Sequence, residues 1–348
     1  MSAGPLHFVV PGDIDTPTGG YGYDRRIAAG LCALGWEVRI VSLPGTYPET
    51  DEATLAQAVT VFARLPDGAL VLVDGLAFAR LPQIVRRHQE RLRLAALVHH
   101  PLADEGGLPE PTASSYLADE KLALKSARAV ICTSRTTGRR LVEHYGVGEA
   151  ALQIAPPGTE RKSLLTEHRD GTLILCVAAI VPRKGHDVLV NALSALEDLP
   201  WTARFVGPFR DDAWRRRITG LIAHHGIEDR IALTGPLADL DAQYSQAGIF
   251  ALATRHEGYG MAYAEALAAG LPVVGCSVGA VPEVVPPEAG ALVAPDDPAA
   301  FADALRILLT RPDAYATAAE GARAAARTLP RWEDSVSIIA RALEDIDR

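Results

Sequence analysis

Short apolar runs alternate with stretches of helical period along the whole chain. Apolar runs bounded by turn residues are typical of buried strands, and apolar residues every three or four positions are typical of helices. The alternation predicts an α/β protein with parallel sheets covered by helices. The strands expected are residues 6–10, 37–42, 69–73, 95–98, 129–133 and 152–155 in the first half, and 173–178, 202–206, 230–233, 248–253, 272–276 and 291–293 in the second.

The chain is long enough for two such domains. It has 348 residues, whereas single cores rarely grow beyond roughly 250–300. Pro156-Pro157-Gly158, followed by polar residues to Asp170, predicts the connection between two doubly wound domains. We therefore expect a first domain over residues 1–160 and a second over 161–330. Pro330 separates the second domain from a last helix over about residues 331–348.

Composition and charge limit the classes of molecule that the chain is expected to bind. The net charge of −9 lacks the basic excess of a nucleic-acid binder. No apolar run approaches the roughly 20 residues of a membrane helix, and no signal peptide is recognisable at the start. Residues 86–93 are basic and predict a helix, which is either a solvated face or a weak contact with anionic lipid. We expect a cytoplasmic protein, with peripheral membrane association as the alternative.

The cysteines agree with a reducing compartment. They lie far apart among apolar residues and form no metal-type pair. We expect buried free thiols at all four positions, which are Cys32, Cys132, Cys176 and Cys276.

The most informative segment is residues 255–272. Glu257 precedes a glycine-rich turn that opens a helix near Gly260, Glu265 lies inside that helix, and Gly270 ends it. Amides at a helix start attract anions. Such a site suits a ligand with an anionic centre and hydroxyl-rich ends, and a sugar nucleotide has that form.

A second segment places two cations at a strand end. Arg183 and Lys184 follow one predicted strand and precede a helix, which is where ligands of open parallel sheets bind. Arginine grips phosphate oxygens in bidentate fashion, and lysine adds a compact charge. The alternative is a solvated loop pair. Because the pair occurs together with the segment at residues 255–272, we favour a diphosphate site.

These segments resemble the family 4 glycosyltransferases, which are retaining enzymes of GT-B fold. The resemblance is carried by Glu-x7-Glu at Glu257 and Glu265, by residues 279–283 (GAVPE), by residues 177–185 (VAAIVPRKG) and by residues 154–158 (IAPPG). The first half matches more loosely, through Gly19-Gly20 and His99. The resemblance implies two Rossmann-like domains facing across a cleft, with the acceptor on the first and the donor on the second.

The resemblance also implies roles for residues. Glu265 would accept hydrogen bonds from ribose hydroxyls, and Glu257 would face the sugar ring. The last helix would return to the first domain, with Trp332 at the crossing. The alternative for Trp332 is an ordinary core aromatic. Amides that would hold sugar hydroxyls or phosphate are those of Gly258, Tyr259, Gly260 and Met261. Tyr259 stands where the family often has Phe.

The first domain offers a glycine turn and two histidines. Gly19-Gly20-Tyr21-Gly22 lacks the dinucleotide fingerprint, because Arg25 occupies the place of its third small residue. The resemblance implies that Gly19 and Gly20 lie near sugar and acceptor; a purely structural turn is the alternative. His99 and His100 end a strand, and His99 best matches the family histidine that reaches the transferred sugar, with His100 left open.

We expect no metal ion and no cofactor. Asp13-Ile14-Asp15 and Asp239-Leu240-Asp241 imitate a metal-binding Asp-x-Asp motif, but Arg183 and Lys184 would already neutralise the diphosphate.

The expected activity is that of a retaining hexosyltransferase. It would use a UDP- or GDP-sugar and a hydroxyl acceptor, which is a saccharide, a lipid-linked molecule or a small molecule. His99, Arg183, Lys184 and Glu257 would serve catalysis. The alternatives are a GT-B sugar-nucleotide epimerase or phosphorylase, or a catalytically silent subunit that binds sugar nucleotides. The sequence contains no pattern that identifies the acceptor, the base and sugar of the donor, the linkage formed or the oligomeric state.

Overall fold

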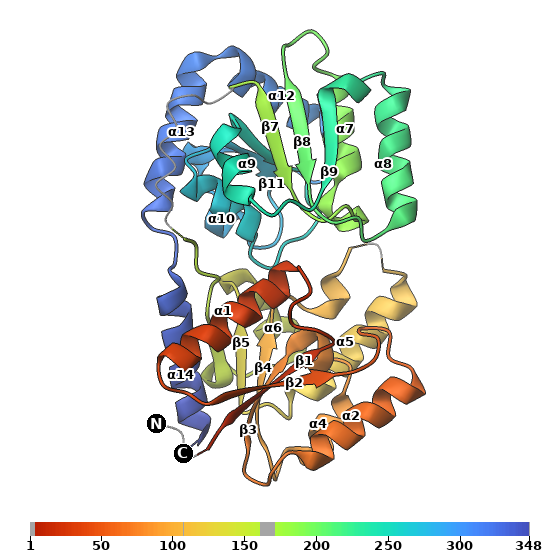
Figure 1. Cartoon of the computed structure of the whole chain (residues 1–348), viewed down its shortest axis with the longest axis vertical. Coiled ribbons are helices and arrows are strands. Elements are labelled where there is room, and N and C mark those ends of the chain that lie inside the picture. The colour runs from red at the N-terminus through yellow and green to blue at the C-terminus, as the bar shows by residue number, and fades with distance from the viewer. Residues whose placement is uncertain (1–3, 107, 161–170, 348) are drawn as a thin grey trace. The chain divides into compact units, whose positions relative to one another are not determined.

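The computed structural model describes residues 4–106, 108–160 and 171–347. The chain forms two compact units (Figure 1): unit 1 is Met1–Gly158 with Pro330–Arg348, and unit 2 is Thr159–Leu329. The unit boundaries lie beside the expected ones at residues 160 and 330. Of the expected connection up to Asp170, residues 161–170 lie outside the described part.

Unit 1 is built on a parallel six-stranded sheet in the order β2-β1-β3-β4-β5-β6. The chain order reverses between β1 and β3. The strands are β1 (Leu6–Pro11), β2 (Val38–Leu43), β3 (Leu70–Asp74), β4 (Arg93–Val98), β5 (Ala129–Cys132) and β6 (Leu152–Ile154).

Strand residues of unit 1 alternate between two hydrophobic clusters, one on each face of the sheet, because successive side chains point to opposite faces. Phe8 and Leu72 pack with α1 and α14, whereas Val9 and Val73 pack with the remaining helices. The helices are α1 (Gly19–Ala33), α2 (Glu52–Arg64), α3 (Gly75–Phe78), α4 (Pro82–His88), α5 (Glu110–Leu124), α6 (Arg135–Tyr145) and α14 (Trp332–Asp347), with 3₁₀ turns η1 (Leu102–Asp104) and η2 (Glu149–Ala151).

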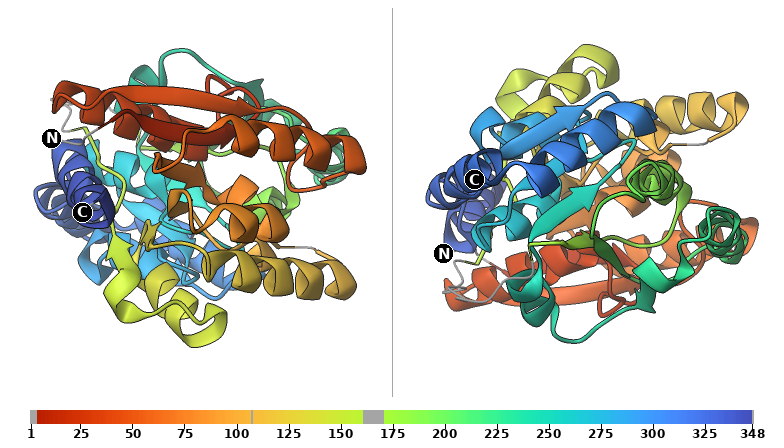
Figure 2. Two further views of the ribbon diagram at one scale, coloured as in Figure 1. Left: turned by 90° about the horizontal axis from the view of Figure 1, so that it is seen from below. Right: turned by 90° about the horizontal axis from the view of Figure 1, so that it is seen from above.

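The C-terminal helix α14 belongs to unit 1 and packs against α1 (Figures 1 and 2). The packing is close, since a Cβ added to Gly30 of α1 would lie 2.3 Å from Cγ2 of Val336. At the start of α14, the Trp332 ring lies 5.7 Å from that of Tyr23. The expected return of the last helix to the first domain is therefore present.

Unit 2 repeats the architecture with the order β12-β11-β10-β7-β8-β9, again all parallel. Here the chain order reverses between β7 and β10. The strands are β7 (Leu173–Val177), β8 (Thr202–Val206), β9 (Ile231–Gly235), β10 (Ile249–Leu252), β11 (Val273–Cys276) and β12 (Gly290–Val293).

Helices cover this second sheet and complete a single large core. They are α7 (His186–Ser194), α8 (Asp212–His224), α9 (Leu240–Gln246), α10 (Met261–Ala268), α11 (Val281–Val284), α12 (Pro298–Thr310) and α13 (Pro312–Ala326), with 3₁₀ turns η3 (Pro182–Lys184), η4 (Glu228–Arg230) and η5 (Pro287–Ala289). Each of the twelve expected strands is present, with ends that differ by up to two residues.

Two expectations need correction. The basic run 86–93 is not one helix, because α4 ends at His88 and Arg93 begins β4. Its later arginines are tied down: Arg91 donates to the carbonyls of Leu65 and Phe62, and Arg93 pairs with Asp347. Cys32 is exposed rather than buried, because it lies on the outer side of α1 near its end; all four thiols are free.

Among the described residues, none of the helices combines the length and apolarity needed to cross a bilayer.

Candidate functional site

The polar loops of unit 2 meet where its strand order reverses. The loop after β7 carries Arg183 and Lys184, and the loop after β10 carries Glu257. Ligands of doubly wound sheets bind outside the carboxyl ends of strands at such a reversal. Topology therefore brings together cations and a carboxylate more than 70 residues apart in the chain.

Gly185 lets the cationic loop lie directly on the end of β10. Its φ of +62° is in the left-handed region, and an added Cβ would lie 1.8 Å from the carbonyl oxygen of Ala253. Only glycine satisfies both the dihedral angle and the close approach. Because Gly185 directly follows Arg183 and Lys184, this close approach fixes the position of both cations at the carboxyl end of β10.

Arg255 clamps the same loop from the other side. Its backbone N–H donates to the carbonyl of Arg183 at 2.8 Å, and its guanidinium donates to the carbonyl of Pro182 at 2.5 Å. The guanidinium also reaches Asp187 at 2.9 Å and Asp296 at 2.7 Å. Sequence reasoning missed this residue, although a charged side chain three residues after the end of buried β10 was a usable signal.

Glu257 is the centre of the cluster and is only 7% exposed. Nζ of Lys184 lies 2.5 Å from its Oε1, and Nη1 of Arg183 lies 3.9 Å from its Oε2. Burial alone would raise the pKa of Glu257, but the charges of Lys184 and Arg183 outweigh it and hold that pKa below its usual range. Glu257 is therefore an anion held by cations in a site of low exposure.

The GAVPE turn at residues 279–283 packs against the backbone of Glu257. An added Cβ at Gly279 would lie 2.1 Å from the carbonyl oxygen of Glu257, and the same oxygen accepts a hydrogen bond from Ala280 at 3.1 Å. Loops after β7, β10 and β11 thus fix the position of one carboxylate.

Helix α10 begins where the glycine signals predict. Gly260 is its N-cap, with φ of +99°, and it has no side chain that could accept from the first amides. Glu265 lies within the helix, and its Oε2 accepts a hydrogen bond of 2.8 Å from the hydroxyl of buried Tyr244. Tyr244 was not predicted as part of the site; it holds one oxygen of the carboxylate expected to meet ribose.

The other expected amides belong to the turn between Glu257 and α10. Tyr259 is buried, whereas Gly258 and Met261 are partly exposed. Met261 is the first residue of α10. The structure therefore brings Arg183, Lys184 and Glu257 into contact, and places the glycine turn and Glu265 on the segment that follows.

In unit 1, Gly19 and Gly20 form the first turn of α1 rather than a turn before it. The hydroxyl of Thr18 caps the helix by accepting from the amide of Tyr21 at 3.0 Å. Gly20 lies over the His99 ring: an added Cβ would be 3.4 Å from Cδ2 and 3.6 Å from Nε2. The tertiary structure thus joins the two features that sequence reasoning singled out in this half.

His99 makes two contacts with buried carboxylates. Its Nε2 lies 3.1 Å from Oδ1 of Asp24 and 3.2 Å from Oδ2 of Asp74. Burial would lower the pKa of His99, but the charges and hydrogen bonds of Asp24 and Asp74 raise it well above 6.5. Asp24, on α1, and Asp74, at the end of β3, were not predicted, because nothing in their local sequence marks them.

His100 has a different environment, since its Nε2 lies 3.0 Å from Oε2 of Glu105. The Asp-x-Asp triplets serve local structure: Asp13 accepts from the amide of Asp15, and Asp239 caps α9 through the amide of Ala242. Among the described residues, Asp24, Asp74 and His99 form a group of the kind that can hold a metal ion. Their potential ligand atoms lie within 4.8 Å of one another.

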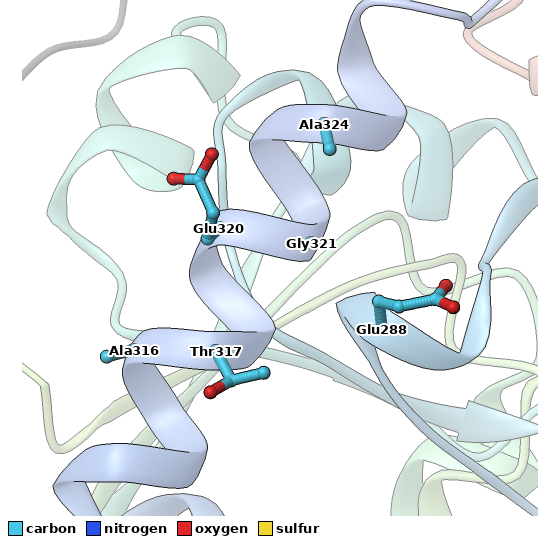
Figure 3. A pocket seen from close by; sticks show the side chains of 6 residues that line it. All are labelled: Glu288, Ala316, Thr317, Glu320, Gly321 and Ala324. Atoms are coloured by element: carbon cyan, nitrogen blue, oxygen red, sulfur yellow. The ribbon is translucent and has the colours of Figure 1, made fainter.

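A shallow depression lies on the surface of unit 2 between α13 and η5 (Figure 3). Gly321 of α13 packs closely on η5 there, since an added Cβ would lie 2.0 Å from the carbonyl oxygen of Glu288. Its lining is small or acidic, with Glu288 and Glu320 as the charged members. Such a surface repels phosphate, so the depression is not part of the candidate site.

Comparison with known proteins agrees with this geometry. Residues 171–311, which carry all of the unit 2 cluster, match the family model of the group 1 glycosyl transferases. The lipopolysaccharide core biosynthesis mannosyltransferase LpsB of Rhizobium meliloti is 30% identical over 246 residues, covering 66% of this chain and 68% of that protein. The chain belongs to the group 1 glycosyltransferases.

The D-inositol 3-phosphate glycosyltransferase of Xylanimonas cellulosilytica is 31% identical over 255 residues, which cover 67% of this chain and 60% of that protein. The chain spans 60 to 65% of the length of the first three inositol-phosphate relatives it matches.

Solved structures identify the fold of this group 1 glycosyltransferase as GT-B. Sucrose-phosphate synthase from Thermosynechococcus elongatus aligns with a TM-score of 0.81 over 99% of both chains at 22% identity. HepE of Anabaena, solved in complex with UDP-glucose, aligns with a TM-score of 0.75 over 97% of this chain and 99% of that chain, at 17% identity. The expected fold class is confirmed.

Proposed function

We propose that this chain is a retaining glycosyltransferase of the family 4 type, which moves a hexose from a UDP- or GDP-sugar to a hydroxyl acceptor. The observation that carries the proposal is the contact of Lys184 and Arg183 with buried Glu257 at the strand-order reversal of unit 2. A diphosphate needs fixed cations and amides, and a sugar ring needs a positioned carboxylate. Family membership supports the same reading.

In this proposal, Lys184 and Arg183 bind the diphosphate and stabilise the charge that develops as the bond between the anomeric carbon and the phosphate oxygen breaks. They would supply the charge that a divalent ion supplies in other classes, so transfer would need no metal. Glu257 would accept from sugar hydroxyls, and Glu265, oriented by Tyr244, would accept from ribose.

Retention of configuration is compatible with attack from the face that the phosphate leaves. The acceptor oxygen would form the new bond to the anomeric carbon while its proton passes to the departing phosphate oxygen. A double displacement would instead need a carboxylate on the opposite face of the ring, and neither Glu257 nor Glu265 is assigned to that place.

The names of the relatives do not decide whether the donor nucleotide carries uracil or guanine. One solved relative of the fold was crystallised with UDP-glucose, and one curated relative is named as a GDP-mannose-dependent mannosyltransferase of Mycolicibacterium smegmatis. Thermal unfolding of the full chain with UDP-, GDP- and ADP-sugars would choose between them, because a ligand that binds the folded state raises its melting temperature.

Turnover with the stabilising donor tests the activity itself. Arg183→Ala, Lys184→Ala and Glu257→Ala should each reduce transfer by roughly 100-fold or more, whereas Arg311→Ala, at an exposed cation of the same unit, should leave it unchanged. Near-normal transfer in all three variants would refute the proposal. Sugar inversion without an acceptor, consumption of inorganic phosphate, or binding without turnover would instead identify an epimerase, a phosphorylase or a silent subunit.

A further inference from the structure

The His99 cluster holds two buried acidic groups and one basic group. Asp24 and Asp74 are 0% and 2% exposed, respectively. Asp74 is well satisfied as an anion, because Oδ1 accepts from the amide of Leu76 at 2.8 Å and Oδ2 faces His99. Asp24 is not, because its Oδ2 is buried without a hydrogen-bond partner in the described part of the chain.

The charges decide the protonation state of the ring. If both carboxylates were ionised beside a neutral imidazole, two buried anions would face each other uncompensated, which is costly. An imidazolium compensates one of them, and a proton on Asp24 relieves the other. Burial raises the pKa of Asp24, which agrees with that second proton. Another titratable neighbour is Tyr23, whose ring meets the His99 ring edge-on at 5.4 Å and whose pKa is also raised by burial.

The opposite side of the ring is available. The described residues supply no hydrogen-bond partner for Nδ1, and the side chain of His99 is 20% exposed. The hydroxyl of Thr133 donates to the carbonyl of His99 at 2.8 Å, which fixes the backbone at this strand end. An imidazolium held by Nε2 therefore presents Nδ1–H as a fixed, charged donor.

We propose that Asp24 and Asp74 are positioning residues that hold His99 through Nε2 and keep it as an imidazolium, so that Nδ1–H donates to a hydroxyl of the bound substrate. Such a donor forms a charge-assisted hydrogen bond, which is about twice as strong as a neutral one. The role toward substrate rests on the proposed function, whereas the charge of His99 is measurable without it.

The first test is nitrogen NMR of the histidine rings in the full chain, with His99 assigned by its loss in His99→Gln. We expect His99 to remain charged at neutral pH and in each single variant, Asp24→Asn and Asp74→Asn, because one carboxylate remains. In the double variant, burial without an anion should make the ring neutral at neutral pH. A neutral His99 in the unmodified chain, or a charged one in the double variant, would overturn the proposal.

A control and a competing ligand complete this test. Asp67→Asn changes an aspartate whose side chain is 86% exposed and should leave the His99 signals in place. Zn²⁺ or Mn²⁺ should also leave them in place. Tight binding of either ion with loss of the ring proton would mean that the three side chains are metal ligands, which would contradict the proposal. If the double variant does not fold, the unmodified and single variants still decide the charge.

The second test uses turnover. The double variant should lower kcat by roughly tenfold or more, with little change in KM for the donor, and lowering the pH should restore part of the loss by protonating His99. A loss that lower pH does not restore would indicate a merely structural role. If the unmodified chain transfers no sugar, the proposed function fails, whereas the NMR result on His99 still stands.

Discussion

Nζ of Lys184 and Oε1 of Glu257 lie 2.5 Å apart, although 73 positions separate the two residues in the sequence. The side chains are 16% and 9% exposed, so water screens their attraction little. A buried pair of this kind does not by itself stabilise a fold strongly, because both ions lose hydration. Under the proposed function the pair has a further role, because Lys184 would exchange the carboxylate for phosphate oxygens when a diphosphate binds.

Removing one partner should therefore cost more than removing both. Lys184→Met should lower the free energy of unfolding by about 1–3 kcal/mol, since it leaves Glu257 buried without its nearest cation. The double variant Lys184→Met/Glu257→Gln should be more stable than the sum of the single effects indicates. Urea unfolding of the four proteins measures this coupling.

The exposed pair Arg323 and Glu320 provides the control, because its members lie 2.9 Å apart with 48% and 64% of their side chains exposed. The corresponding cycle there should be additive within about 0.5 kcal/mol. Equal coupling in both pairs would mean that the burial of Glu257 has no energetic effect.

Acid should destabilise unit 2 through His186. Burial, reinforced by the charge of Lys184, lowers the pKa of this histidine to about 3. Below pH 6.5 the unfolded chain takes up a proton that the folded chain refuses, so stability falls as pH drops from 6.5 towards 3. His186→Gln should flatten this dependence, as measured by the urea midpoint at neutral and at mildly acidic pH.

The half-exposed His144 serves as the comparison, because His144→Gln should leave the slope unchanged. An equally steep loss of stability in His186→Gln would assign the acid sensitivity to other groups.

Gly185 should be irreplaceable for two separable reasons. Gly146 has a similar φ of +73° but open space around its Cβ direction, whereas an added Cβ at Gly185 would lie 1.8 Å from Ala253 O. Gly146→Ala should cost about 1 kcal/mol, for the dihedral angle alone. Gly185→Ala should exceed that cost by about 1 kcal/mol or more and should abolish stabilisation by the donor, because the cationic loop must move. Thermal unfolding with and without donor measures both the stability cost and the stabilisation by the donor. Equal stability costs of Gly146→Ala and Gly185→Ala would contradict the close contact at Gly185.

Arg255 should control the affinity for the donor without touching it. Its guanidinium joins Pro182, Asp187 and Asp296 at once, and lysine cannot reproduce that planar fork. Arg255→Lys should weaken donor binding roughly tenfold, or by about 1.4 kcal/mol, as measured by calorimetry. Arg306 makes two hydrogen bonds with Asp198 on the surface, and Arg306→Lys should leave donor binding unchanged. An equal loss of affinity in both variants would contradict a role of Arg255 in holding the cationic loop.

Much of the fold was readable from the chain because it depends on local signals. Apolar runs predicted each strand in the described part of the chain, and Gly260 and Gly270 marked the limits of α10 within two residues. The same local reasoning failed at residues 86–93, where a basic pattern looked continuous although the chain passes from α4 into β4. It also placed Gly19 and Gly20 before α1, because glycine at a helix start looks like a turn.

The sequence by itself determined the alternation of strands and helices, the glycines at close approaches, and the segments around Arg183, Glu257 and His99. Only the tertiary structure decided which polar side chains meet: Arg255 with the cationic loop, Tyr244 with Glu265, and Asp24 and Asp74 with His99. The reason is physical. Periodicity reports which face of an element is buried, whereas contacts between distant side chains depend on strand order and register, which no local pattern encodes.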